Sequence, residues 1–168
     1  MVPTITHDRL LELLAYDPKT GLFRWYVKRR GRGSTSWFSG SIHGAGYRVI
    51  GIDLRLYLAH RLAWFYVHGV WPTNELDHKD RNRSNNAIEN LREATRSENG
   101  RNTSLRSDNT SGAKGVIWSK ACGKWLAQIH AEGRGSFIGV FESKEEAIRA
   151  YAEEAKKCFG EFHHIARS

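Results

Sequence analysis

The sequence predicts an α+β fold built from two small modules. Short strand-like runs alternate with apolar stretches at helical spacing in the first hundred residues. The last third contains three strand-like runs followed by one long helix pattern. A polar, basic segment without periodicity lies between these two regions. We therefore expect an N-terminal domain at residues 1–99, a basic linker at 100–112 and a C-terminal domain at 113–168.

Composition limits the classes of function that fit this chain. The 168 residues carry a formal net charge of +8, which favours a polyanionic partner such as nucleic acid over a merely solvated basic surface. Two cysteines are too few for a disulfide framework or a four-cysteine zinc site, which fits a reducing cytoplasm. No run approaches 18 continuous apolar residues, and the first residues lack a signal pattern, so we expect a cytoplasmic protein without a membrane partner.

The first predicted element is an amphipathic helix with Thr6 as its N-cap and leucines from Leu10 to Leu14 on its apolar face. The sequence "DPKTG" at 17–21 is a turn signal, and "LFRWYV" after it is typical of a strand. The glycine-rich stretch that follows predicts a loop. Together these features predict a helix and a strand joined by a tight turn.

A hairpin and a helix follow the glycine-rich loop. Residues 47–58 predict two strands with a turn near Asp53-Leu54, and 59–69 is apolar at helical spacing with Gly69 as its stop. His60 opens this helix, and we expect a helix-start histidine with satisfied hydrogen bonds rather than a phosphate ligand. Pro72 then breaks the chain before a short extended segment, and a short helix is expected to begin around 93–97.

The segment "NELDHKDRNRSNNAIENLREATRSENGRN" collects the residues that suggest chemistry. Phosphodiester hydrolysis needs an activated water, and a neutral imidazole such as that of His78 suits this task near neutral pH. It also needs charge stabilisation, and the oxygens of Asp77 and Asn99 are hard ligands for a divalent cation. Neighbouring residues on a strand point to opposite faces, so Asp77 and His78 can serve a metal and a water separately. Asn90 is placed to accept a hydrogen bond from the His78 ring.

This segment resembles the active site of HNH nucleases, most closely the phage and intron homing endonucleases that have Asn at the third position. The likeness rests on Asp77-His78, on Asn90 twelve residues after His78, and on Asn99 nine residues further on. "AHRLAWFYVHG" is similar to the helix that precedes this element in the same branch. The resemblance implies a ββα-metal module with His78 as general base, Asn90 as the residue that orients it, and Asp77 and Asn99 as metal ligands.

The resemblance also implies a cofactor and a setting. Because Asn is a weaker ligand than His, we expect one exchangeable Mg²⁺ or Mn²⁺ ion per active site instead of tightly held Zn²⁺. The setting would be a bacterial or phage-infected host cell. A simpler interpretation makes Asp77 a turn cap, His78 a packing residue and the asparagines loop formers. Four residues at matching spacing in a basic chain favour the nuclease.

The C-terminal module has its own sequence signals. In "KWLAQIHA", strand alternation puts Trp125, Ala127 and Ile129 on one face, which leaves Lys124, Leu126, Gln128 and His130 on the other. The helix after these strands is predicted to begin with a capping box between Ser143 and Glu146. We expect a three-stranded antiparallel sheet packed on this helix, with Trp118 and Trp125 in the core.

Residues 111–165 resemble the DNA-binding domain of plant ethylene-response (Apetala-type) factors, through "KGV", "GKWLAQI", "FIGVF" and "SKEEAIRAYAEEAKKCFGEF". In that family the sheet lies in the DNA major groove. The resemblance implies DNA contacts from Lys114, Lys120, Lys124, Gln128, His130, Arg134 and Phe137. Arg101 and Arg106 in the linker are expected to follow the DNA backbone. Ile117 and His130 replace arginines of the plant domains, so sequence preference does not carry over.

The interpretation as a whole is a site-specific, divalent-metal-dependent DNA endonuclease of the homing type that acts on double-stranded DNA. One active site cuts one strand, so nicking and double-strand cleavage both stay open, as does the oligomeric state. Two alternatives are a non-catalytic DNA-binding regulator and an RNA-binding or RNA-cleaving protein. The complete Asp77, His78 and Asn99 set argues against the first, and the lack of exposed aromatic RNA motifs argues against the second.

Overall fold

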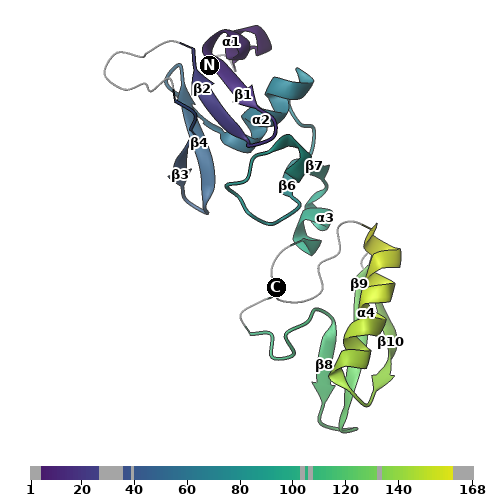
Figure 1. Cartoon of the computed structure of the whole chain (residues 1–168). Helices are drawn as coiled ribbons and strands as arrows, with labels where there is room; N and C mark the ends of the chain where they lie inside the picture. The colour runs from purple at the N-terminus through teal and green to yellow at the C-terminus, as the bar shows by residue number, and fades with distance from the viewer. Residues whose placement is uncertain are drawn as a thin grey trace. The chain divides into compact units, whose positions relative to one another are not determined.

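Figure 1 shows the chain as a computed structural model. It describes residues 5–26, 36–38, 40–102, 105, 108–131 and 134–160. The chain divides into two compact units, residues 1–96 and 97–168. Helices and strands are mixed in the chain and the sheets are small and antiparallel, which fits the α+β class. No helix in the described ranges is long and apolar enough to cross a membrane.

The first unit consists of short elements that form three small sheets. In chain order these are α1 (His7–Leu13), β1 (Leu14–Asp17), β2 (Leu22–Trp25), β3 (Ser41–His43), β4 (Tyr47–Ile52), β5 (Arg55–Leu58), α2 (Ala59–His68), β6 (Glu75–His78), the 3-10 helix η1 (Ile88–Asn90) and β7 (Leu91–Ala94). β1 pairs with β2, β4 lies between β3 and β5, and β6 pairs with β7, all antiparallel. The helix α3 (Arg96–Arg101) follows β7.

Three local sequence signals are confirmed in this unit. The Thr6 side chain accepts a hydrogen bond from the backbone of Arg9 and caps α1. The β4–β5 turn falls at Asp53-Leu54, and both residues adopt the left-handed conformation that such a turn requires, with φ of 46° and 63°. Gly69 ends α2 in the left-handed region with φ of 71°.

The core of the first unit lies between α1, α2 and the strands β1, β2 and β4. Its fully buried side chains include Leu10, Leu14, Phe23, Ile52 and Leu62. Apolar burial of this kind is the main stabilising contribution in a small unit. This core therefore holds α2 and β4 in place, and these two elements carry residues that contact His78.

Three strands were not predicted. Leu14 was assigned to the first helix but begins β1. β3 lies within the stretch that was expected to be a loop, and β7 occupies residues whose apolar spacing suggested a helix. The cross-strand pairs β1–β2 and β6–β7 explain two of these differences, because pairing with a partner strand overrides local helical spacing.

In the second unit a three-stranded sheet packs on one helix, as the sequence predicts. Its elements are β8 (Val116–Ser119), β9 (Lys124–Ala131), β10 (Arg134–Phe141) and α4 (Lys144–Phe159), with sheet order β10-β9-β8. Ser143 and Glu146 form the expected capping box at the start of α4. Ala127 and Ile129 of β9 are buried with Ala147 and Tyr151 of α4, so the predicted facing of β9 is confirmed.

One core prediction for this unit is wrong. Trp118 is 48% exposed, although it pairs directly with Trp125 and the two rings meet edge to face at 5.2 Å. Trp125 is partly buried against the core cluster of the second unit. Trp118 sits on β8, at the edge of the sheet, where it is covered on fewer sides.

Candidate active site

Asp77 and His78 lie at the end of β6, where the sequence places them. The β6–β7 hairpin pairs Asp77 with Arg92 and His78 with Leu91. The two site residues are almost fully buried, at 5% and 4% exposure. A buried carboxylate and a buried imidazole both need partners, since an unpaired polar group in the interior is costly.

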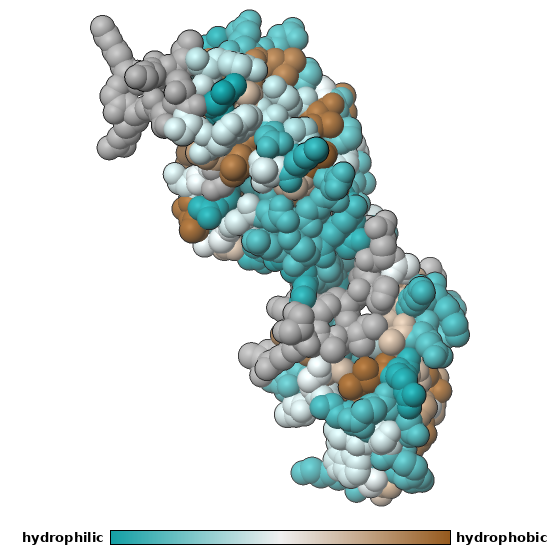
Figure 2. Space-filling model, in the orientation of Figure 1, coloured by the Kyte–Doolittle hydropathy of each residue, from teal (hydrophilic) through white to brown (hydrophobic). Residues whose placement is uncertain are grey.

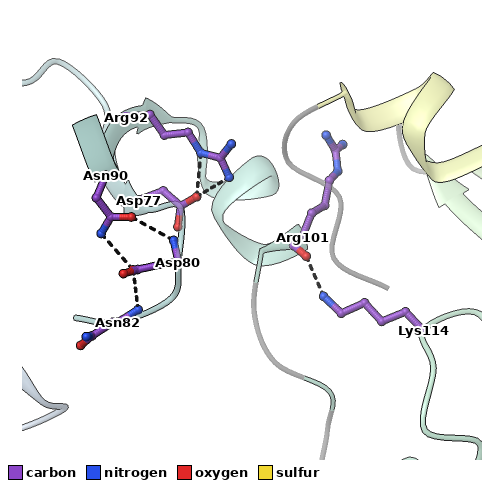
Figure 3. Close-up of polar contacts among 7 residues, drawn as sticks. All are labelled: Asp77, Asp80, Asn82, Asn90, Arg92, Arg101 and Lys114. Carbon is purple, nitrogen blue, oxygen red and sulfur yellow. Dashed lines mark hydrogen bonds and ion pairs between the residues drawn. The ribbon is translucent and has the colours of Figure 1, made fainter. Parts of the chain in front are cut away.

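Arg92 is the partner of Asp77 (Figure 3). Its Nε and Nη2 atoms both donate to Oδ2 of Asp77, at 3.0 and 2.8 Å. This cross-strand ion pair is buried on both sides, which fixes the orientation of the carboxylate. A carboxylate can accept about four hydrogen bonds or metal bonds.

Asn86, not Asn90, binds the His78 ring. The Oδ1 atom of Asn86 lies 3.1 Å from Nε2 of His78, and both side chains are buried. With the amide oxygen facing the ring, Nε2 carries the proton and Nδ1 is the basic atom of His78. Burial lowers the pKa of His78, and the Asn86 bond opposes this shift. The ring is therefore neutral at neutral pH, as a general base requires.

The loop that carries Asn86 is held by the β1–β2 turn. The Tyr16 hydroxyl donates to the backbone oxygen of Asn86 at 2.8 Å, and the backbone N–H of Ile88 donates to Pro18 at 3.0 Å. Gly21 lies so close that a Cβ atom there would come within 2.4 Å of the Asn86 backbone. Glycine at this position, with φ of 71°, allows the turn to press against the Asn86 loop.

The expectation that Asn90 binds His78 is therefore corrected. The Asn90 amide nitrogen donates to Oδ1 of Asp80 at 2.9 Å, and the Asn90 side-chain oxygen accepts from the Asp80 backbone at 3.0 Å (Figure 3). Asn85 and the backbone of Asn82 also donate to the Asp80 carboxylate. Burial opposes ionisation of Asp80, but these hydrogen bonds outweigh it and lower its pKa. Asn90 thus closes the loop around Asp80.

Asn99, the second predicted metal ligand, lies on α3 as expected. α3 continues into the second unit. Carboxylate and amide oxygens such as those of Asp77 and Asn99 suit hard ions that keep several waters, namely Mg²⁺ or Mn²⁺. Among the described residues, no group of three or more His, Cys, Asp or Glu side chains is arranged to hold a metal ion. Asp77 and Asn99 each carry an oxygen donor of the kind that an exchangeable hard ion prefers.

Basic residues surround the His78 region. Arg83 stacks on the Tyr47 ring at 4.9 Å, and Arg48 donates to the Ser84 hydroxyl at 3.2 Å. Figure 2 shows hydrophilic residues gathered over the part of the first unit where Figure 1 places β6, β7 and their loop. Arginines presented in this way are suited to phosphate oxygens.

The structure gives the predicted DNA-contact residues of the second unit different environments. Gln128, His130, Arg134 and Phe137 are exposed on β9 and β10, and Lys120 is exposed in the β8–β9 turn. Gln128 pairs directly with Phe137, and His130 with Gly135. Lys124 forms an exposed ion pair with Glu142 at 2.6 Å. Arg106 lies outside the described residues.

Arg101 and Lys114 are hydrogen-bonded to each other, and both line one cavity. The Lys114 ammonium donates to the backbone oxygen of Arg101 at 2.6 Å (Figure 3), and the Arg101 guanidinium stacks on Phe159 at 4.4 Å. Both residues line a cavity of about 610 Å³ together with Gln128 and His130. Four of the predicted contact residues are thus brought to one place within the second unit.

Comparison with known proteins identifies the class of the domain that holds this site. Residues 57–101 match the family described as HNH endonuclease, so the chain carries an HNH endonuclease domain there. The matched segment includes α2, the β6–β7 hairpin and α3.

The chain is also similar to Protein 3.8 of Escherichia phage T7. The two are 40% identical over 76 residues, which cover 45% of this chain and 63% of the phage protein. The chain therefore spans less than two thirds of this relative. No solved structure matches the chain significantly.

Proposed function

We propose that this protein is a site-specific, divalent-metal-dependent DNA endonuclease of the homing type, with His78 as its general base. The observation that carries the proposal is the buried His78 ring, held by Asn86 beside Asp77 within the HNH endonuclease domain. The similarity to a phage protein supports a setting in phage-infected cells, where the protein would act in the cytoplasm.

The reaction follows from the hydrogen bond at His78. Because Nε2 donates to Asn86, Nδ1 is the atom that takes the proton from the attacking water. The water then attacks phosphorus in line with the 3′ oxygen that leaves. Asp77 and Asn99 would hold one Mg²⁺ or Mn²⁺ ion, which supplies stabilisation of negative charge when it is bound. Arg92 keeps the Asp77 carboxylate in place during this step.

The C-terminal unit is proposed as the DNA reader, in line with its Apetala-type resemblance. The face of the sheet opposite α4 exposes Gln128 and Phe137 as a direct cross-strand pair. Ile117 and Val140 are exposed on the neighbouring strands, and both pair with Leu126 of β9. Gln can make two hydrogen bonds to adenine, and apolar side chains contact the thymine methyl group. This face therefore favours sites that contain A·T pairs.

The experiment that tests the proposal measures the conversion of a supercoiled plasmid that carries the protein's site into nicked or linear DNA. Cleavage is expected with Mg²⁺ or Mn²⁺ and is expected to stop with a chelator. Asn99→Ala should need more Mg²⁺ for the same rate, while Asn99→His should keep activity and shift preference toward softer ions. If Asn99→Ala cuts as well as wild type at limiting Mg²⁺, Asn99 is not a ligand. A protein that binds the plasmid but never cuts it would support the regulator instead.

A further inference from the structure

A second imidazole packs against the proposed base. His60, in the first turn of α2, is 5% exposed. Its ring meets the His78 ring edge to face, with centroids 5.2 Å apart and planes at 72°. The Tyr47 ring of β4 contacts both imidazoles, with its centroid 5.2 Å from that of His60 and 6.2 Å from that of His78. The His78 side chain is thus packed by two aromatic residues from two other elements.

The expectation of a satisfied helix-start histidine is wrong. Nδ1 of His60 is buried and has no hydrogen-bond partner among the residues that the structure describes. A buried polar atom without a partner costs roughly 1–3 kcal/mol, so an apolar side chain of similar shape would be more favourable for folding alone. Asn86, a hydrogen-bond partner of His78, also has a buried nitrogen, Nδ2, that has no partner within the described part of the chain. Both residues that carry this cost contact His78.

The bond from Asn86 holds the Nε2 side of the His78 ring, and the rings of His60 and Tyr47 pack against the ring itself. The torsion that turns an imidazole has a broad, roughly two-fold energy profile. A turn of the ring would exchange the positions of nitrogen and carbon atoms and move Nδ1 away from the water it must deprotonate. An aromatic ring packed edge to face, in a densely packed interior, blocks such a turn.

We propose that His60 is a positioning residue for cleavage: its ring, packed against both Tyr47 and His78, fixes the plane of the His78 imidazole and so the direction of Nδ1. This inference rests on the proposed nuclease function of His78. His60 acts through His78 and contacts neither the water nor the phosphate. Burial keeps His60 uncharged, since it lowers the pKa of this ring to about 3, so His60 does not compete for the proton.

The first test compares two substitutions at His60 with a control on the same helix. His60→Ala removes the ring, and we expect kcat to fall on the order of 10- to 100-fold with little change in KM, as for other residues that orient a reacting group. His60→Phe keeps an aromatic ring and should recover most of this loss. Leu62→Ala is the control, because Leu62 is a fully buried core residue of α2. It should lower stability and leave kcat close to wild type.

The second test observes the His78 ring directly, without DNA or metal. Nitrogen-15 NMR of the imidazole distinguishes the two neutral tautomers. Wild type and His60→Phe should show His78 with the proton on Nε2, whereas His60→Ala should show averaged nitrogen shifts. Leu62→Ala should give the wild-type spectrum.

The outcomes are separable. The proposal is overturned if His60→Ala cleaves as fast as wild type, or if its rate falls no more than that of Leu62→Ala. An unchanged His78 spectrum in folded His60→Ala would also overturn it. A wild-type protein that never cleaves would overturn the nuclease function, while the NMR comparison would still decide whether His60 fixes the His78 ring.

Discussion

Asp77 and Arg92 face each other across the β6–β7 hairpin, and two guanidinium nitrogens donate to one carboxylate oxygen. Both side chains are about nine-tenths buried or more. The pair gives a buried carboxylate a cationic partner, and it links the proposed metal ligand to the stability of the hairpin.

Replacing Arg92 should destabilise the first unit strongly. Arg92→Met leaves the Asp77 carboxylate buried without its cation, and loss of one partner of a buried pair costs about 3–5 kcal/mol. Urea denaturation measures this free energy. Lys79→Met is the matched control, since Lys79 is exposed directly after β6 and should change stability by no more than about 0.5 kcal/mol. A loss below about 1 kcal/mol for Arg92→Met would contradict a stabilising pair.

Asn86 and Asn90 should differ in their effects on cleavage. Asn86→Ala removes the hydrogen bond to His78, so kcat should fall on the order of 10- to 100-fold. Asn90→Ala removes bonds around Asp80, and should lower stability by about 1–2 kcal/mol with a smaller change in kcat. Single-turnover kinetics and urea denaturation separate the two. A larger rate loss in Asn90→Ala would restore Asn90 as the residue that orients the base.

The stability of the first unit should fall as pH falls from 6.5 toward 3. Burial, with the charges of His78 and Arg61, lowers the pKa of His60 from 6.5 to about 3. In this window the unfolded chain binds a proton at His60 that the folded chain does not, so acid favours unfolding. His60→Phe lacks this group, while Tyr47, His78, Arg61 and Arg83 remain around the site.

Urea denaturation of wild type and His60→Phe near neutral pH and near pH 4.5 measures this effect. From neutral pH to pH 4.5, the free energy of unfolding should fall less in His60→Phe than in wild type. The difference between the two falls should be a few kcal/mol at most. Equal losses in the two proteins would show that His60 does not resist protonation.

Two residues of β9, Gln128 and Lys124, test whether the face of the C-terminal sheet opposite α4 contacts DNA bases. Gln128→Ala should reduce discrimination at one base position by roughly 1–3 kcal/mol, because a bidentate contact to a base edge is lost. Lys124→Ala should weaken all sequences alike, and only slightly, since Lys124 is already paired with Glu142. Binding to a set of site variants measures both. Unchanged discrimination in Gln128→Ala would mean that this face does not contact the bases.

The sequence predicted the extended segment that carries Asp77 and His78, but it did not predict every strand around it. Asp77 and His78 could be proposed as site residues because their chemistry and spacing are local properties. β7 was missed because Leu91 and Ala94 are three residues apart, as in a helix, and only pairing with β6 makes the segment a strand. Asn86 was missed because an asparagine in an Asn-rich loop is typical of turns. Its role depends on Tyr16 and Gly21, far away in the sequence.

The exposure of Trp118 and the orphan nitrogen of His60 have the same explanation. The environment of each side chain depends on how other elements pack around it, and a local sequence pattern does not predict this packing. Trp118 has the alternation of a core residue but lies at the sheet edge. His60 has the position of a helix-start histidine, but α2 turns it toward His78 instead of a hydrogen-bond partner.

The central claim is that His78 is the base that activates water for DNA cleavage. Single-turnover cleavage by wild type and His78→Ala, at DNA concentrations that saturate both proteins and with Mg²⁺ present, tests it most directly. The rate should fall on the order of 10²–10⁴-fold while the affinity for the DNA site stays nearly the same. Wild-type cleavage by His78→Ala would contradict the account.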